Sequence, residues 1–301
     1  MSGNASGVQQ PGLVQRYRQR YPWLDHLVRA GQNYLANHGD HYAAAITYFS
    51  VLSLVPLLMM AFAVAAIVLV GNQQLLGELQ EQIRTAAPAG LGETLNEVIT
   101  ESIESRGSVG ILGLLLALYS GLAWMGNLRE ALTAQWTQRH EPQSFLRTTL
   151  VDLLALLGLG IALVVSFALT GVGAGFAGAL LDLAGFGDTF WARQVLRILT
   201  VLLSLTGMWL VFLWVIARLP REPVTLRNAI RAAVFAAIGF ELLKQAFAGY
   251  LDVVSSSPTG SLFGPVIGLM VFAYFVSRFL LFITAWAATA KENLPPTAPA
   301  A

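Results

Sequence analysis

The sequence predicts an all-α membrane protein, a bundle of six transmembrane helices whose N- and C-termini both lie in the cytoplasm. The first observation behind this prediction is composition. Of the 301 residues, 55% are hydrophobic and 12% are charged, whereas soluble domains average about 25% charged residues. The second is a set of six apolar segments long enough to cross about 30 Å of hydrocarbon. The third is the distribution of the arginines, which favours one side of the membrane.

The spans follow from the lengths of the apolar runs, since a helix of about 20 residues crosses the bilayer core. The loops and termini on one side carry twelve of the 18 Lys and Arg residues, and the opposite side carries four. The positive-inside rule therefore places both termini in the cytoplasm, in agreement with an even number of spans. The predicted membrane domain, residues 43–290, has spans at 43–70, 108–126, 150–181, 195–217, 229–250 and 262–288.

Residues 1–42 are predicted to form a cytoplasmic or interfacial N-terminal segment, because they are polar and precede the first apolar run. That run starts too far from the N-terminus for a cleavable signal peptide, so we expect the first span to stay in the mature protein. Residues 13–38 intersperse arginines with aromatic and aliphatic side chains and are interrupted at Pro22. This pattern fits a basic amphipathic helix on the inner leaflet, and it equally fits a cytoplasmic helix packed on the bundle.

Residues 71–107 are predicted to form an extracytoplasmic helical loop. Aliphatic residues recur at helical spacing on both sides of a break at residues 87–90, which predicts two short amphipathic helices within 73–105. Six glutamates make this loop acidic, and we interpret them as a solvated helical face. Residues 291–301 are rich in proline and alanine and are expected to form a disordered tail.

Glu241 and Lys244 are ionisable residues inside the fifth apolar segment. Their spacing of three puts them on one helical face. Placing a lone charge at bilayer depth costs at least about 2.5 kcal/mol, and an adjacent opposite charge offsets part of that cost. They form either a substrate or proton site or a structural ion pair that fixes helix packing. Arg278, in the sixth span, either snorkels to the inner interface or points inward. In the second case the three residues give a net positive cavity suited to an anionic headgroup.

Hydroxyl and small residues predict further features of the helices. Thr47, Ser50 and Ser53 form a stripe in the first span, ahead of Pro56, which predicts a kink. The stripe lines a pathway or serves as a packing surface on which hydroxyls bond back to the backbone. Small residues at four-residue spacing predict close helix packing in the third and sixth spans: Gly171, Gly175, Gly260, Gly264 and Gly268.

Signals for an enzyme are poor. The chain contains no cysteine, which excludes thiolate catalysis and Cys-based metal sites. His38 and His41 lack further metal ligands in an obvious position, and no phosphate-binding loop or nucleophilic serine motif is present. The net charge of +1 shows no basic excess for nucleic acid. We therefore expect no catalytic site, metal, cofactor or nucleic-acid partner.

Four stretches of the chain resemble sequence motifs of one protein family. They lie in the first span, after the second span, in the fifth span and in the sixth span, respectively: Tyr42–Pro56, Leu128–Trp136, Glu241–Lys244 with Tyr250, and the stretch from Gly264 onward. In this order they resemble the BrkB/YihY family of bacterial inner-membrane proteins, especially its YhjD-like members. Many members have Gly-Ala-Glu near the end of the last span, whereas this chain has Thr284-Ala285-Trp286.

The resemblance implies six helices, cytoplasmic termini, a location in the bacterial inner membrane and a role in transport or envelope lipids. The family was once labelled ribonuclease BN, but the sequence has no carboxylate–histidine metal cluster to support that chemistry. Our leading hypothesis is a secondary transporter or flippase-like protein for an amphipathic or anionic envelope substrate. Its polar site consists of Glu241 and Lys244, with Tyr250, Arg278 and the hydroxyl stripe as secondary contacts. The alternative is a non-transporting membrane scaffold or assembly partner. Either protein has lipids as neighbours and small-residue faces for a homo-oligomer.

Overall fold

The computed structural model describes residues 21–68, 77, 108–138, 144–183, 190–222, 224–254 and 258–290, and within them the secondary structure is entirely helical. The prediction of an all-α protein is therefore confirmed for this part of the chain. Six of the helices coincide with the six predicted spans, and a seventh precedes them. In chain order the helices are α2 (Pro22–Ala36), α3 (Gly39–Val68), α6 (Ser108–Gln135), α7 (Phe145–Leu183), α8 (Phe190–Arg218), α9 (Leu226–Val254) and α10 (Pro258–Ala288).

Most of these helices extend beyond the apolar runs that predicted them, because backbone hydrogen bonding continues after the side chains become polar. The longest, α7, has 39 residues. Among the described residues, four stretches have the length and composition to cross a membrane: Leu146–Ser166, Gln194–Arg218, Leu226–Tyr250 and Val266–Ala288. The count of six spans and the cytoplasmic location of the termini remain predictions.

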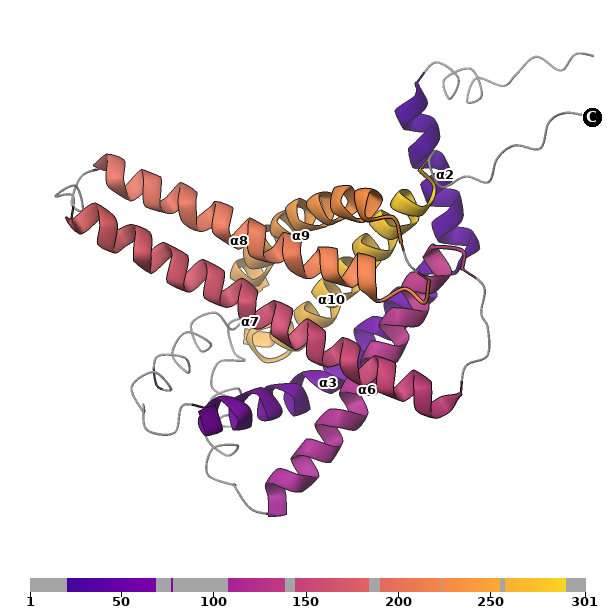
Figure 1. Ribbon diagram of the computed structural model, residues 1–301, viewed down its shortest axis with the longest axis horizontal. Helices are drawn as coiled ribbons and strands as arrows, with labels where there is room; N and C mark the ends of the chain where they lie inside the picture. The colour runs from indigo at the N-terminus through magenta and orange to yellow at the C-terminus, as the bar shows by residue number, and fades with distance from the viewer. Residues whose placement is uncertain are drawn as a thin grey trace, which may run out of the picture.

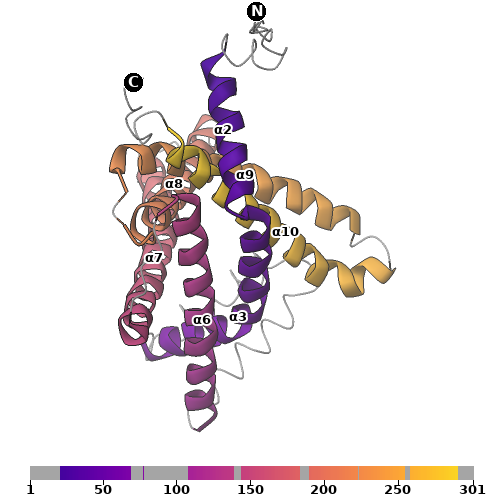
Figure 2. The ribbon, with the colours of Figure 1, turned by 90° about the vertical axis from the view of Figure 1, so that its right-hand side faces the viewer.

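Consecutive helices pack in pairs, α3 with α6, α7 with α8, and α9 with α10, and α10 also packs on α3. Figures 1 and 2 show these pairs meeting at one end of the molecule and spreading apart toward the other. The buried core lies where they meet and includes Met125, Leu132, Ile216, Ala236 and Leu281. We call this part the converging end; it contains the starts of α3, α7 and α9 and the ends of α6, α8 and α10.

Helix α2 packs on the bundle at the converging end. His26 Nε2 donates a hydrogen bond to the Trp286 carbonyl of α10 at 2.8 Å, and the two rings stack 5.0 Å apart. Asn33 Nδ2 donates to the Gln135 carbonyl of α6 at 2.9 Å. These contacts show that α2 packs on the bundle; its location in the cytoplasm or on the inner leaflet stays a prediction. Figures 1 and 2 show that α2 and the end of α10 lie side by side, so both ends of the described chain share one side of the bundle.

Helix α2 begins at Pro22, which occupies the first turn, where its missing N–H costs no hydrogen bond. Helix α3 contains Pro56 and changes direction part-way along its length, as Figures 1 and 2 show. A proline inside a helix removes one backbone hydrogen bond and bends the chain. The predicted amphipathic helices within 73–105, except residue 77, and the predicted tail at 291–301 lie outside the described residues, as do residues 1–20 of the N-terminal segment.

Candidate functional site

Glu241 and Lys244 form the ion pair that their spacing predicts. Lys244 Nζ lies 2.6 Å from Glu241 Oε2, and Gln245 Nε2 donates a hydrogen bond to Glu241 Oε1 at 3.3 Å. The pair lies within one helix, α9, so it joins no two helices. Half of the Lys244 side chain and 28% of the Glu241 side chain are exposed. Both charges therefore lie at the surface of this chain, inside a stretch with the length and composition to cross a membrane.

Aromatic rings surround the rest of this stretch of α9. Gly239 lies directly under the ring of Phe279, where a Cβ atom would overlap it, so α9 and α10 approach closely here. Further along, Phe247 stacks on Phe272 of α10 with ring centroids 4.7 Å apart, and Tyr250 stacks on Phe247 at 6.0 Å. Tyr250 is exposed. The ring contacts place Tyr250 beyond the ion pair, toward the end where the helix pairs spread apart.

Arg278 pairs with Asp40 of α3, a partner that the sequence analysis did not consider. Arg278 Nε lies 2.8 Å from Asp40 Oδ1, and 42% of each side chain is exposed. The Tyr34 hydroxyl donates a hydrogen bond to the same carboxylate oxygen at 2.7 Å. Burial of Tyr34, followed by its bond to Asp40, raises the pKa of this phenol to about 12. Asp40 lies three residues before the predicted first span, so the pairing places Arg278 level with the polar end of that span.

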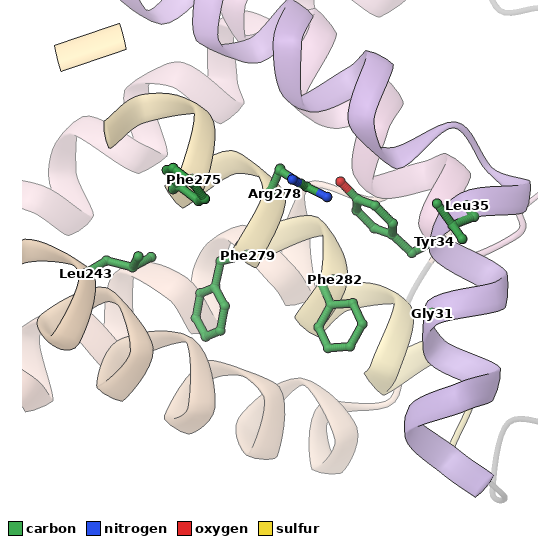
Figure 3. A pocket seen from close by; sticks show the side chains of 8 residues that line it. All are labelled: Gly31, Tyr34, Leu35, Leu243, Phe275, Arg278, Phe279 and Phe282. Atoms are coloured by element: carbon green, nitrogen blue, oxygen red, sulfur yellow. The ribbon is translucent and has the colours of Figure 1, made fainter. Parts of the chain in front are cut away.

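A groove runs between α2, α9 and α10, with a cavity volume of about 440 Å³. Figure 3 shows the guanidinium of Arg278 directed toward the Tyr34 hydroxyl, with three phenylalanine rings spread along α10 on the same side as Arg278. Asp40, at the start of α3, contacts both the guanidinium and the hydroxyl. The groove is thus an apolar surface with one cation on its wall. Its lining comes from all three helices: Gly31, Tyr34, Leu35, Leu243, Phe275, Arg278, Phe279 and Phe282.

The hydroxyl stripe of α3 is engaged in bonds within the bundle. Thr47 Oγ1 donates to the Ala43 carbonyl at 2.7 Å, and Ser53 Oγ donates to the Ser50 carbonyl at 3.3 Å. Ser50 Oγ accepts a 2.7 Å hydrogen bond from Trp124 Nε1 of α6. These contacts are those of a packing surface, the second interpretation of the stripe. Thr47, Ser50 and Ser53 are not brought together with Glu241 and Lys244 by any contact among the described residues.

The small residues are placed in part. Gly264 and Gly268 are buried in α10, as expected for a close-packed helix face. Gly171 and Gly175 lie within α7 and Gly260 lies within α10, but their packing lies outside what the structure describes. Of the residues that depart from the family pattern, Thr284 and Ala285 are fully buried, and Trp286 holds α2 through His26.

The converging end contains an ionic network, one pair of which is buried, that the sequence analysis did not identify. Arg129 of α6 and Asp152 of α7 pair at 3.0 Å, with 5% and 8% of their side chains exposed. Arg221, after α8, pairs with Glu130 at 2.9 Å, and its backbone N–H donates to Thr133 Oγ1 at 3.4 Å. Asp152 lies inside the predicted third span, so the test that identified Glu241 would also have identified it. Its partner lies on another helix and follows from no spacing rule.

This network is incompletely satisfied. Asp152 Oδ1 and Arg129 Nε are buried and have no hydrogen-bond partner among the described residues. Leaving a buried polar atom unpaired costs about 1–3 kcal/mol.

The described residues were also searched for a metal site. No cluster of three His, Asp or Glu side chains that could hold a metal ion occurs within them.

Comparisons with known proteins place the chain among bacterial membrane proteins. A family model described as virulence factor BrkB matches residues 30–301. An uncharacterized protein of Dickeya dadantii is 40% identical over 96% of this chain and 90% of its own length. Inner membrane protein YhjD of Escherichia coli is 37% identical over 93% of this chain and 85% of its own length.

A more distant relative bears on the question of catalysis. A protein of Bacillus subtilis named putative ribonuclease-like protein YfkH is 25% identical over 80% of this chain and 86% of its own length. The names of the relatives thus include both membrane proteins and one ribonuclease-like protein, so the expectation of no enzymatic activity remains a prediction. No solved structure matches the chain.

Proposed function

The chain belongs to the virulence factor BrkB family of membrane proteins, and from this premise we propose that it is a multi-pass inner-membrane protein that moves an anionic amphiphile across the bilayer. Its apolar helices support the membrane location, and so does the name of its relative, inner membrane protein YhjD. An amphiphile from the bacterial envelope is the substrate class that fits a helix bundle with polar groups on lipid-facing surfaces. The motion is passive or driven by a gradient, because the sequence carries no nucleotide-binding motif.

The observation that carries this proposal is the exposed ion pair on α9. Hydrocarbon solvates neither Glu241 nor Lys244, and a charge at bilayer depth costs at least about 2.5 kcal/mol. Mutual pairing at 2.6 Å lowers that cost without removing it, because both side chains remain partly exposed. Such residues in membrane proteins face water-filled paths or substrates. We infer that the polar side chains on the surface of α9 give a headgroup a polar contact within the apolar layer.

Translocation in proteoliposomes tests the proposal. The wild-type protein is compared with a Glu241→Gln, Lys244→Met double variant, using fluorescently labelled phosphatidylglycerol and phosphatidylcholine and reduction of the label on one leaflet. We expect the wild type to move the anionic lipid faster than protein-free vesicles do. The double variant should return the rate to that background, because the headgroup loses its polar partners.

Two control variants show whether a loss of transport is specific to the Glu241–Lys244 pair. An Arg147→Gln variant removes an exposed cation at the start of α7, far along the chain from the pair, and should keep the wild-type rate. A Glu241→Lys, Lys244→Glu variant keeps an ion pair but exchanges its ends. This variant should lose transport if the headgroup binds to the two charges in their native positions. It should keep transport if the pair only stabilises the helix. Full activity of the neutral double variant would remove the assigned site.

A scaffold role is the second candidate, and the ionic network favours it. Arg129, Asp152 and Arg221 tie α6, α7 and the segment after α8 together at the converging end, as suits a rigid anchor for other proteins. This role predicts that folded wild-type protein never moves lipid, and that a specific envelope protein co-purifies with it. Chemical crosslinking of the full chain in its native membrane, with crosslinks placed on α2, distinguishes the two roles.

A further inference from the structure

The groove between α2, α9 and α10 has the size and lining of a ligand site. Its volume of about 440 Å³ falls in the range of about 300–1,000 Å³ that small-molecule sites occupy. Phe275, Phe279 and Phe282 of α10 form one wall, and Leu243 of α9 extends it. Gly31 of α2 leaves space at the opposite side, since a Cβ atom at this position would have no neighbour within 4 Å. An apolar chain therefore fits this groove.

Arg278 supplies the charge on the groove wall. A guanidinium carries five N–H donors in a planar fork that matches the oxygens of a phosphate group. Asp40 engages Nε at 2.8 Å, and 42% of the Arg278 side chain remains exposed. An anion can thus approach the guanidinium from the open side of the groove. Asp40 acts as an internal competitor, because a ligand phosphate has to share Arg278 with it.

The surroundings of the groove identify the kind of anion. Phe275 and Leu35 at its edges are half exposed or more, and two of its helices, α9 and α10, have the length and composition to cross a membrane. The part of the groove between α9 and α10 therefore opens sideways onto hydrocarbon, whereas the part beside α2 lies toward the polar end. Asp40 and Arg278 lie level with the polar end of the predicted first span. A molecule with a phosphate at this level and apolar chains beside it is a phospholipid in its normal bilayer orientation.

We propose that this groove binds one anionic phospholipid taken sideways from the bilayer. Its phosphate lies on Arg278, and one acyl chain lies against Phe275, Phe279 and Leu243. The inference rests on the proposed function, because it gives the substrate of that function a first binding site. The lipid phosphate displaces Asp40 from Arg278 or shares Arg278 with it. We expect a headgroup of net negative charge to bind better than a zwitterionic one, whose cation would lie beside the guanidinium.

Binding of lipid to the purified full chain tests the proposal without requiring transport. The probe is phosphatidylglycerol titrated into detergent-solubilised protein and counted by native mass spectrometry, with phosphatidylcholine and inorganic phosphate as separate arms. We expect preferential binding of phosphatidylglycerol. Arg278→Gln should weaken it about tenfold or more, the equivalent of one charged hydrogen bond. Asp40→Asn should strengthen it severalfold, because the competing carboxylate is gone.

A pair of glycine variants tests the groove apart from the charge. Gly31→Leu fills the open side of the groove, and Gly160→Leu adds the same side chain on α7, where a Cβ atom likewise meets nothing within 4 Å. Gly31→Leu should lower phosphatidylglycerol binding about tenfold, and Gly160→Leu should leave it unchanged. Thermal unfolding of each variant establishes that it is folded.

Three outcomes overturn the proposal: equal binding by Arg278→Gln and wild type, equal binding by Gly31→Leu and Gly160→Leu, or competition by inorganic phosphate as strong as by the lipid. The two proposals fail separately. If the Glu241→Gln, Lys244→Met variant binds lipid normally but does not move it, both proposals stand. If wild type moves lipid while Gly31→Leu changes nothing, the groove proposal alone is refuted.

Discussion

Removal of the Asp152 carboxylate tests whether its buried pair with Arg129 stabilises the converging end. Asp152 and Arg129 have 8% and 5% of their side chains exposed and meet at 3.0 Å. Their attraction is about 5 kcal/mol at an effective dielectric constant of about 20. Desolvation costs several kcal/mol for each ion and offsets this attraction. The net contribution of the intact pair is therefore small, whereas one charge left alone in the same place is costly.

We expect Asp152→Leu to lower the free energy of unfolding by about 3–5 kcal/mol, because Arg129 then stays buried without a partner. The double variant Arg129→Met, Asp152→Leu should recover most of that loss, since no buried charge remains. Arg147 is an exposed residue two turns or less from Asp152 along α7 and provides a control. Arg147→Gln should change the free energy of unfolding by less than about 0.5 kcal/mol.

Equilibrium unfolding by a denaturing detergent, followed by circular dichroism, measures all four proteins under one condition. A loss below about 1 kcal/mol for Asp152→Leu would refute the claim that the pair is buried from solvent. A double variant as unstable as the single one would show that shape, and not uncompensated charge, sets the cost.

Two further predictions concern packing and pH. Gly158 lies directly against the ring of Trp214 of α8, where a Cβ atom would overlap it, whereas Gly160 faces open space. Gly158→Val should therefore destabilise the α7–α8 pair by about 1–3 kcal/mol, and Gly160→Val should not. The unfolding midpoints of the two variants measure this difference, and equal midpoints would contradict the packing of Gly158 on Trp214. The second concerns Tyr34, whose pKa is raised from 10.0 to about 12. Between these values the folded state binds more protons than the unfolded state, so stability falls as the pH rises from 10 toward 12. Tyr34→Phe should lose that part of the pH dependence, and an unchanged slope would argue against a buried phenol.

The positions of the helices were largely predictable from local pattern. Long apolar runs identify membrane helices because hydrocarbon requires every backbone group to be satisfied within its own segment, and each predicted span coincides with one helix. The Glu241–Lys244 pair was predictable for the same kind of reason, since a spacing of three puts two side chains on one face. The ends of the helices were less predictable than their positions. For example, α3 begins at Gly39 and α6 ends at Gln135, and both residues lie outside the apolar runs.

The candidate site itself depended on contacts between distant residues. Arg278 was identified as an ionisable residue in a span, but its partner Asp40 lies on the first of the paired helices, and the groove beside it is lined on one side by α2. The hydroxyl stripe was visible in the sequence, yet its engagement by Trp124 required α6 to pack on α3. No periodicity predicts which helix lies beside which.

The class of protein, the helical segments and the charges within them can be predicted from the sequence, because these depend on transfer into lipid and on bonds made within one segment. The environment of those charges depends on contacts between helices. Packing of the helices leaves Glu241 and Lys244 at the surface of α9, joins Arg278 to Asp40 beside an apolar groove, and buries Arg129 with Asp152. The physical reason is that the energy of a charge depends on its solvent and its partners, and both are supplied by residues far away in the chain.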